Sequence, residues 1–195
     1  MPRPAKPDLK DKILSVASEK FFRHGFSRVS IDELVMNVRT SKSAVYKFFP
    51  SKEDLLNAVL VSLNQNINLN ISLIVNDSSR TFLQKLEAII TFTSGILQRV
   101  SKDFIDDMRI NAPGIWQEYL KMRKERLDNL YLKFFKQGVK QGYLRKDIPL
   151  NFILLVYTKL TEIVVDPSSL DSFQLSNKNA YNMLSRLFLE GAKPK

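Results

Sequence analysis

The spacing of apolar residues predicts a chain made of helices. From Leu9 to Phe21, apolar side chains recur every three or four positions, which places them on one face of a helix. A similar period recurs in the segments that follow, and no stretch alternates apolar and polar residues as a half-buried strand does. We therefore expect an all-α protein of about nine helices. Their predicted ranges are 9–24, 31–38, 41–48, 52–75, 80–100, 102–110, 113–141, 149–165 and 176–191.

Residues typical of helix ends mark the boundaries in the N-terminal part. Ser30, followed three positions later by Glu33, has the order of a capping box, in which each side chain binds the other residue's backbone N–H. Ser41 can cap the next helix, and Pro50 stops it. Gly25 can end the first helix in a left-handed conformation. Two short helices therefore follow the first one closely.

The short helices at 31–38 and 41–48 have the spacing of a helix-turn-helix, whose second helix enters the major groove of DNA. On a helical wheel of ~100° per residue, the second helix has two faces. One face is polar and suits phosphates and base edges: Lys42, Ser43, Tyr46 and Lys47. The other face is apolar and suits packing on the preceding helices: Ala44, Val45 and Phe48.

A motif at the end of this second helix strengthens the interpretation: Tyr-x-x-Phe at 46–49, followed by Ser-Lys-Glu-x-Leu at 51–55. With it, residues 9–56 resemble the DNA-binding domain of the TetR family of bacterial transcriptional regulators. The resemblance implies a three-helix head joined by a linking helix to a C-terminal helical bundle. The division we expect is a flexible arm at 1–8, a helix-turn-helix DNA-binding domain at 9–56, and a helical ligand-binding and dimerisation domain at 57–195.

Two residues depart from the family pattern. Arg39 stands in the turn between the second and third helices, where the family usually has glycine, and Ser43 stands where it often has glycine or another small residue. An arginine in a left-handed turn costs about 1 kcal/mol relative to glycine. This strain is tolerable, and the alternative is a turn of a different shape. The Arg39 side chain is also a candidate for contacting a phosphate.

The polar face and the resemblance together give nine candidate DNA contacts. Tyr46, Lys47 and Lys52 resemble family positions that hold the DNA backbone, and Lys42 and Ser43 resemble positions that read bases or adjacent phosphates. Structural alternatives stay open: the tyrosine packs in the core, Lys52 pairs with a carboxylate, and the capping serines serve only their helices. The full set is Ser30, Arg39, Thr40, Ser41, Lys42, Ser43, Tyr46, Lys47 and Lys52.

Charge adds support for an anionic partner. The formal net charge is +10, and residues 1–52 hold 11 lysines and arginines against 5 acids. Such a basic module favours nucleic acid first and an acidic membrane surface second, while the alternative is a merely soluble basic protein. The absence of cysteine excludes disulfides. The strongly apolar run 152–157 is too short to cross a bilayer, so we expect a cytoplasmic protein without a membrane partner.

The remaining helices predict a dimerisation surface and a pocket. The last two carry broad apolar surfaces, which in a homodimer can form a four-helix interface. Aromatic and flexible side chains in the middle helices are candidates for binding an apolar or amphipathic effector, and ordinary core packing is the alternative for each. The candidates are Phe92, Phe104, Met108, Trp116, Tyr119, Met122 and Tyr157.

Catalytic chemistry has little support in the sequence. Asp103, Asp106 and Asp107 lie within about one turn, but a solvated acidic surface is favoured over a metal site. His24 is the only histidine, and no nucleophile–base pair is visible, so we expect no enzyme, cofactor or metal. The favoured hypothesis is a repressor that leaves a palindromic operator when its effector binds. The alternatives are a regulator of the same fold that activates or senses no ligand, and a helical carrier or interaction module without specific DNA binding.

Overall fold

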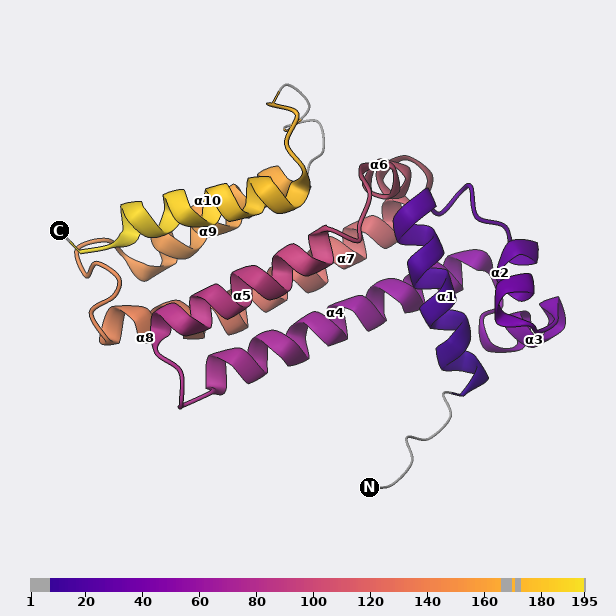
Figure 1. Ribbon diagram of the computed structural model, residues 1–195, viewed down its shortest axis with the longest axis horizontal. Coiled ribbons are helices and arrows are strands. Elements are labelled where there is room, and N and C mark those ends of the chain that lie inside the picture. The colour runs from indigo at the N-terminus through magenta and orange to yellow at the C-terminus, as the bar shows by residue number, and fades with distance from the viewer. Residues whose placement is uncertain (1–7, 166–169, 171–172, 195) are drawn as a thin grey trace. The chain divides into compact units, whose positions relative to one another are not determined.

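The computed structural model describes residues 8–165, 170 and 173–194, and within them it is helical, without strands (Figure 1). All but the last residue of the predicted arm lie outside the described residues. A π-helical stretch, η1, joins α7 to α8 into one continuous helix, so the described residues form nine separate helices, and the all-α prediction is confirmed. The elements are α1 (Leu9–His24), α2 (Ile31–Val38), α3 (Lys42–Phe48), α4 (Lys52–Asn76), α5 (Phe82–Leu97), α6 (Lys102–Asn111), α7 (Pro113–Arg126), η1 (Leu127–Tyr131), α8 (Leu132–Lys140), α9 (Leu150–Val165) and α10 (Asn177–Ala192).

The chain forms two compact units. The first comprises the N-terminal residues up to Leu63 together with Arg99–Gln117, and the second comprises Asn64–Gln98 and the chain from Glu118 onward. Helix α4 is continuous, so its first half belongs to the first unit and its second half to the second. The helix-turn-helix therefore shares its unit with α6, which is distant from it in sequence.

Helix α6 holds the loop between α1 and α2 in the first unit. The backbone N–H of Ser101 donates to the carbonyl of Phe22 at 2.9 Å, and the Phe22 ring meets the Phe104 ring edge-on. Asp107 accepts hydrogen bonds from the backbone N–H of Ser27, at 2.7 Å, and from its hydroxyl. These bonds lower the pKa of Asp107, although its partial burial acts in the opposite direction. The aspartate thus fixes the loop that leads into α2.

Gly25 begins this loop with a positive φ, but not in the left-handed helical conformation that the sequence predicts. Its φ of 89° is positive, but its ψ of 153° is far from the left-handed helical region, so the predicted left-handed cap is wrong in detail. The chain leaves α1 in an extended conformation that only glycine adopts readily. A Cβ at this position would lie 3.0 Å from Asp107 Oδ2, so the aspartate would have to shift by a few tenths of an ångström.

An aromatic cluster forms much of the core of the second unit. The Phe135 ring lies 5.1 Å from that of Tyr157 and 5.4 Å from that of Phe188, between their centroids. These rings bring together α8, α9 and α10, and α10 also packs along α5. Aromatic pairs at such distances add to the stability that their buried area supplies.

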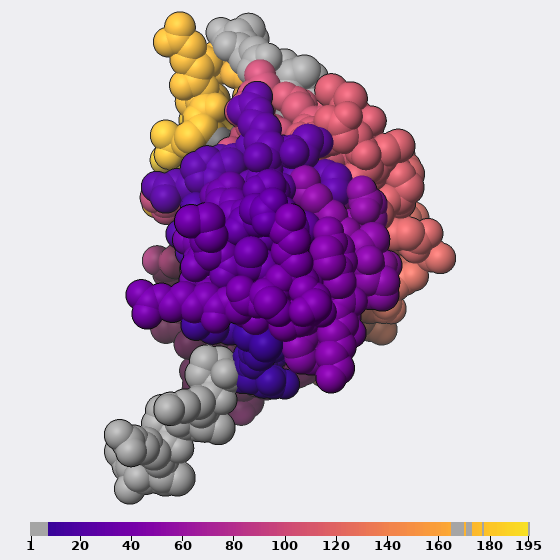
Figure 2. Space-filling view, turned by 90° about the vertical axis from the view of Figure 1, so that its right-hand side faces the viewer, coloured from indigo at the N-terminus to yellow at the C-terminus, as the bar shows by residue number. Residues whose placement is uncertain are grey.

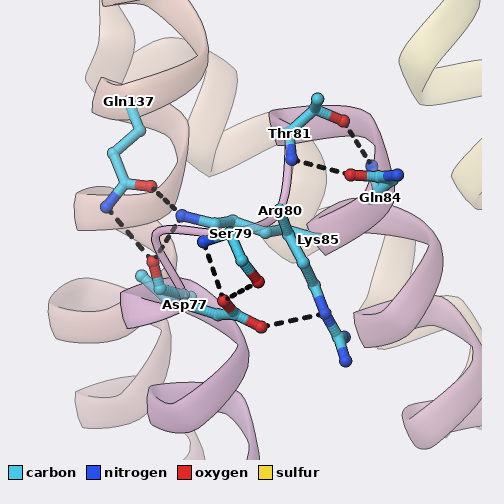
Figure 3. A network of polar contacts seen from close by, with 8 residues as sticks. Asp77, Ser79, Arg80, Thr81, Gln84, Lys85 and Gln137 are labelled. Atoms are coloured by element: carbon cyan, nitrogen blue, oxygen red, sulfur yellow. Dashed lines mark hydrogen bonds and ion pairs between the residues drawn. The ribbon is translucent and has the colours of Figure 1, made fainter.

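A polar network closes the turn between α4 and α5 (Figure 3). The buried Lys85 ammonium donates to the carbonyl of Val75, at 2.9 Å, and to Gln137 Oε1, at 3.2 Å. Thr81 and Gln84 form a complete capping box at the start of α5. The lysine places a positive charge where the dipole of α4 is negative, which compensates for its burial.

Helix α4 has the length and apolar content of a membrane-spanning helix, which the sequence analysis did not identify. A third of its most apolar window is buried within the protein, and one such helix is weak grounds for a membrane span. The helix also carries six asparagines, whose amides are costly to transfer into hydrocarbon. We therefore treat α4 as a packing helix shared by the two units.

Candidate nucleic-acid interface and ligand cavity

Two serine caps place α2 and α3. Ser30 Oγ accepts from the backbone N–H of Glu33 at 3.1 Å, and Ser41 Oγ accepts from that of Ala44 at 3.2 Å. Both helix starts follow the sequence prediction. The other predicted bond of the capping box, from the Ser30 backbone N–H to the Glu33 side chain, is replaced by an ion pair. The Glu33 carboxylate pairs with Lys20 Nζ at 2.8 Å and so links α2 to α1.

The turn between these helices is left-handed at Arg39, so the strained turn forms and the differently shaped alternative does not. Its φ and ψ are 60° and 57°, and its backbone N–H donates to the carbonyl of Val35. Lys12 Nζ donates to the carbonyl of Val38 at 2.9 Å and so satisfies an orphan acceptor at the end of α2. The Arg39 side chain is exposed, and within the described residues it has no acidic partner.

Helix α3 presents a polar face to solvent. Val45 is fully buried, whereas the Tyr46 side chain is 44% exposed, so the alternative that this tyrosine belongs to the core does not hold. Phe48 was expected to pack inward but is 36% exposed, and Phe49 takes its place in the core. The reason is that α3 ends at Phe48, and the extended backbone of Phe49 turns its ring inward.

The two exposed lysines of this face differ in whether an acidic side chain pairs with them. Lys42 Nζ pairs with Asp32 Oδ1 at 2.8 Å, and this hydrogen bond raises the pKa of the lysine. Lys47 is exposed and has no ion pair in the described part of the chain. Figure 2 shows the side of the first unit on which the indigo and violet atoms of α1 to α3 lie outermost. Ser30, Ser41 and Ser43 are exposed as well, and Thr40 is half-buried.

Lys52 takes a more structural position than the other candidates. Its ammonium donates to the carbonyl of Ser27 at 3.3 Å and lies 4.4 Å from the centre of the Phe26 ring. Partial burial lowers the pKa of this lysine. The alternative that Lys52 pairs with a carboxylate does not hold within the described residues. Its contacts are a backbone carbonyl and an aromatic ring.

The comparison with known families identifies the head. Residues 13–59 match the model of the bacterial regulatory proteins of the TetR family. Residues 13–59 therefore form a DNA-binding domain of the TetR type. Its helix-turn-helix is the DNA-binding element of that family.

Relatives are similar to the chain in sequence, and solved structures are similar to it in fold. The chain is 29% identical to the uncharacterized HTH-type transcriptional regulator YuxN of Bacillus subtilis, over 79% of this chain and 60% of that protein. It is 26% identical to the nucleoid occlusion factor SlmA of Aliivibrio fischeri, over 75% of this chain and 74% of that protein. The fatty acid degradation regulator FadR of Bacillus halodurans shares the fold with a TM-score of 0.73 at 15% identity, covering 97% of this chain and 99% of that one. A TetR-family regulator of Agrobacterium tumefaciens gives 0.73 at 17% identity, covering 95% and 98%.

The second unit contains a partly open cavity of about 90 Å³. Of the seven predicted ligand residues, Tyr119 and Tyr157 line it. Phe104, Met108 and Trp116 belong to the first unit, where they are buried. Phe92 and Met122 are half-buried in the second unit and are not among the lining residues. Sequence reasoning missed the remaining walls, which are Ile67, Thr93, Ile96, Leu97, Arg123, Arg126, Leu127, Tyr131, Thr161, Val164 and Tyr181.

Helices α9 and α10 leave a broad apolar surface exposed. Phe152 and Leu155 on α9 are 55% and 51% exposed, and Leu187 on α10 is 67% exposed. A shallow groove lies among them, and its lining is mainly apolar: Ile148, Phe152, Ile153, Val156, Leu160, Leu187, Phe188, Gly191 and Ala192. Contiguous exposed apolar surface of this kind is typical of a protein–protein contact.

Proposed function

We propose that this protein is a repressor that binds a palindromic operator as a homodimer and leaves it when a small molecule binds the second unit. The observation that carries the proposal is the exposed polar face of α3, opposite the buried Val45. A helix anchored on one side and polar on the other can enter the major groove without disturbing its own core. Ser43 and Lys42 would then reach base edges, and Tyr46 and Lys47 the adjacent phosphates.

The dimer would form through α9 and α10. Burying an exposed leucine such as Leu187 removes apolar surface from water, and a two-fold axis lets the same surface cover its own copy. Two heads held in this way could engage successive major grooves, which is the arrangement that a palindrome requires.

Protection of the DNA upstream of the protein's own coding sequence tests the DNA part of the proposal. The wild type should protect a palindrome there, and Lys47→Ala should weaken binding and reduce the slope of log affinity against log salt by about two, since each of two copies loses one phosphate contact. Tyr46→Phe keeps the ring and should lose affinity through the hydroxyl alone. Lys136→Ala removes an exposed cation of α8 and is the matched control. Wild-type affinity in the Lys47 and Tyr46 variants would refute this use of α3.

Sedimentation tests the dimer independently of DNA. Leu187→Glu should convert the dimer to monomer, because each copy would bring an unpaired carboxylate into the interface. Leu73 on α4 is 63% exposed, so Leu73→Glu is the matched control and should remain dimeric. A wild type that sediments as a monomer at all concentrations would refute the interface. A carrier without specific DNA binding, the competing function, predicts ligand affinity that is independent of operator DNA.

A further inference from the structure

Two arginines line the cavity of the second unit, and among the described residues neither has a counter-ion. The Arg126 side chain is buried, and its Nη1 donates to Asn64 Oδ1 and, at 3.4 Å, to Asn68 Oδ1. Arg123 Nη2 donates to Thr161 Oγ1 at 2.8 Å. All three acceptors are neutral, and within the described residues neither guanidinium has a carboxylate at ion-pair distance. A buried charge is normally paired, because removing it from water is costly.

The other polar groups of the cavity cannot supply the missing negative charge. Tyr157 and Tyr181 share a hydrogen bond of 2.9 Å between their hydroxyls, and burial raises the pKa of both, so they stay neutral. Thr93 Oγ1 is buried and has no hydrogen-bond partner of normal geometry among the described residues. The cavity therefore offers an excess of positive charge and of N–H and O–H donors.

Much of the remaining wall is apolar, and one part of it is irregular. Ile67, Leu127 and Val164 contribute aliphatic surface. Leu127 and Tyr131 are the two ends of the π-helical stretch η1, so the distortion of this long helix lies at the cavity. Such stretches occur frequently at functional sites. A cationic end beside an apolar wall suits a molecule with an anionic group and an apolar body.

We propose that the effector is an organic carboxylate whose carboxyl group binds between Arg123 and Arg126. The two arginines are three positions apart on α7, so their side chains lie on one face of the helix. Guanidinium groups bind carboxylates through paired, charge-assisted hydrogen bonds, which are stronger than bonds to an amide oxygen. The cavity volume is only about 90 Å³, so a short-chain or single-ring acid requires less movement of the walls than a larger acid.

The same contact gives a route from the cavity to α4. Arg126 donates to Asn64 and Asn68, which both lie on α4, the helix that begins in the first unit at Lys52. A carboxylate that takes the Arg126 donors releases these two asparagines and so favours another position of α4. This step rests on the proposed repressor function, whereas the binding of the carboxylate does not.

Calorimetry with matched ligand pairs tests the binding. Hexanoate and benzoate should each bind the wild type at least about ten-fold more tightly than hexanamide and benzamide, which have nearly the same shape but no charge. Equal affinity for acid and amide, or no binding of either acid, would overturn the proposal. This comparison uses the full wild-type chain and requires no variant to fold.

Variants assign the contact to the two arginines. Arg123→Met and Arg126→Met should each reduce the affinity for the acid at least about ten-fold and leave that for the amide nearly unchanged. Lys124→Met removes a neighbouring exposed cation, paired with Asp128, and should bind the acid as the wild type does. Asn64→Asp is nearly isosteric and places a carboxylate on Arg126, so it should also weaken acid binding while keeping the fold. Acid binding that survives all three substitutions at positions 64, 123 and 126 would overturn the assignment.

Measurements of operator binding test the carboxylate site and the proposed repressor function separately. Saturating benzoate or hexanoate should lower operator affinity in the wild type, and not in Arg126→Met. If the acids bind through the arginines while operator affinity stays constant, the carboxylate site stands and release through α4 is refuted. If they lower operator affinity without a preference over the amides, the release stands and the carboxylate site is refuted.

Discussion

The left-handed Arg39 makes a quantitative prediction about the stability of the head. Its φ of 60° and ψ of 57° lie in a region that costs a residue with a Cβ about 1–2 kcal/mol, and glycine nothing. Glycine in turn loses about 0.5–1 kcal/mol more conformational entropy on folding. Arg39→Gly should therefore stabilise the protein by about 0.5–1 kcal/mol, which corresponds to a rise in Tm of about 1–4 °C for a chain of this length.

Arg39→Ala is the matched variant, because alanine also lacks the guanidinium but keeps the Cβ. It should be as stable as the wild type or slightly less stable, since the strain remains. Urea and thermal unfolding of the three proteins measure the differences, and an Arg39→Gly variant no more stable than Arg39→Ala would refute the strain argument. Both variants should lose operator affinity equally if the exposed guanidinium contacts a phosphate, so the pair separates backbone strain from DNA contact.

Three further predictions concern the scaffold. Lys85→Met should lower the free energy of unfolding by about 1–3 kcal/mol, measured in urea, because the carbonyl of Val75 loses a charged donor. Asp107 has a pKa below its usual value, so its contribution to stability is complete above about pH 4 and is lost as the pH falls through its folded-state pKa. Asp107→Asn should accordingly lose stability at pH 7 and show a shallower acid-unfolding limb. Gly25→Ala should destabilise the head by about 1–3 kcal/mol, while Gly95→Ala, whose Cβ meets nothing within 4 Å, should stabilise α5 by about 0.5–1 kcal/mol; chemical denaturation distinguishes the two signs.

Local signals in the sequence predict most of the helix-turn-helix. Ser30 and Ser41 act as caps because a serine hydroxyl needs only the backbone N–H three residues ahead, which the helix itself supplies. The left-handed turn at Arg39 is implied only by the resemblance to the TetR family, which usually has glycine at this position. Phe48 and Phe49 exchange roles because a helical wheel assumes that the helix continues, and α3 ends between them.

Contacts between distant segments were beyond sequence reasoning. Nothing in the residues around Asp107 indicates that its carboxylate holds Ser27, 80 positions earlier in the chain, and the sequence reading placed it on a solvated surface. The cavity shows the same limit, since nothing in the residues around Arg126 indicates that its guanidinium donates to Asn64, 62 positions earlier in the chain. Periodicity assigns a residue to a face of its helix, but which helix covers that face depends on the packing of the whole unit.

The second unit buries two cations, Lys85 and Arg126, and only Arg126 indicates a ligand. Lys85 bonds to the carbonyl of Val75 in the last turn of α4, so the negative end of that helix compensates its charge permanently. Arg126 meets α4 at Asn64 and Asn68, far from either end of the helix, where no such dipole end is available. Its amide acceptors are neutral, and a carboxylate would bind it more strongly than they do. The Arg126 donors have hydrogen-bond acceptors, but no negative charge neutralises the guanidinium. A carboxylate ligand can therefore replace the amide acceptors, and a ligand-responsive contact requires this exchange.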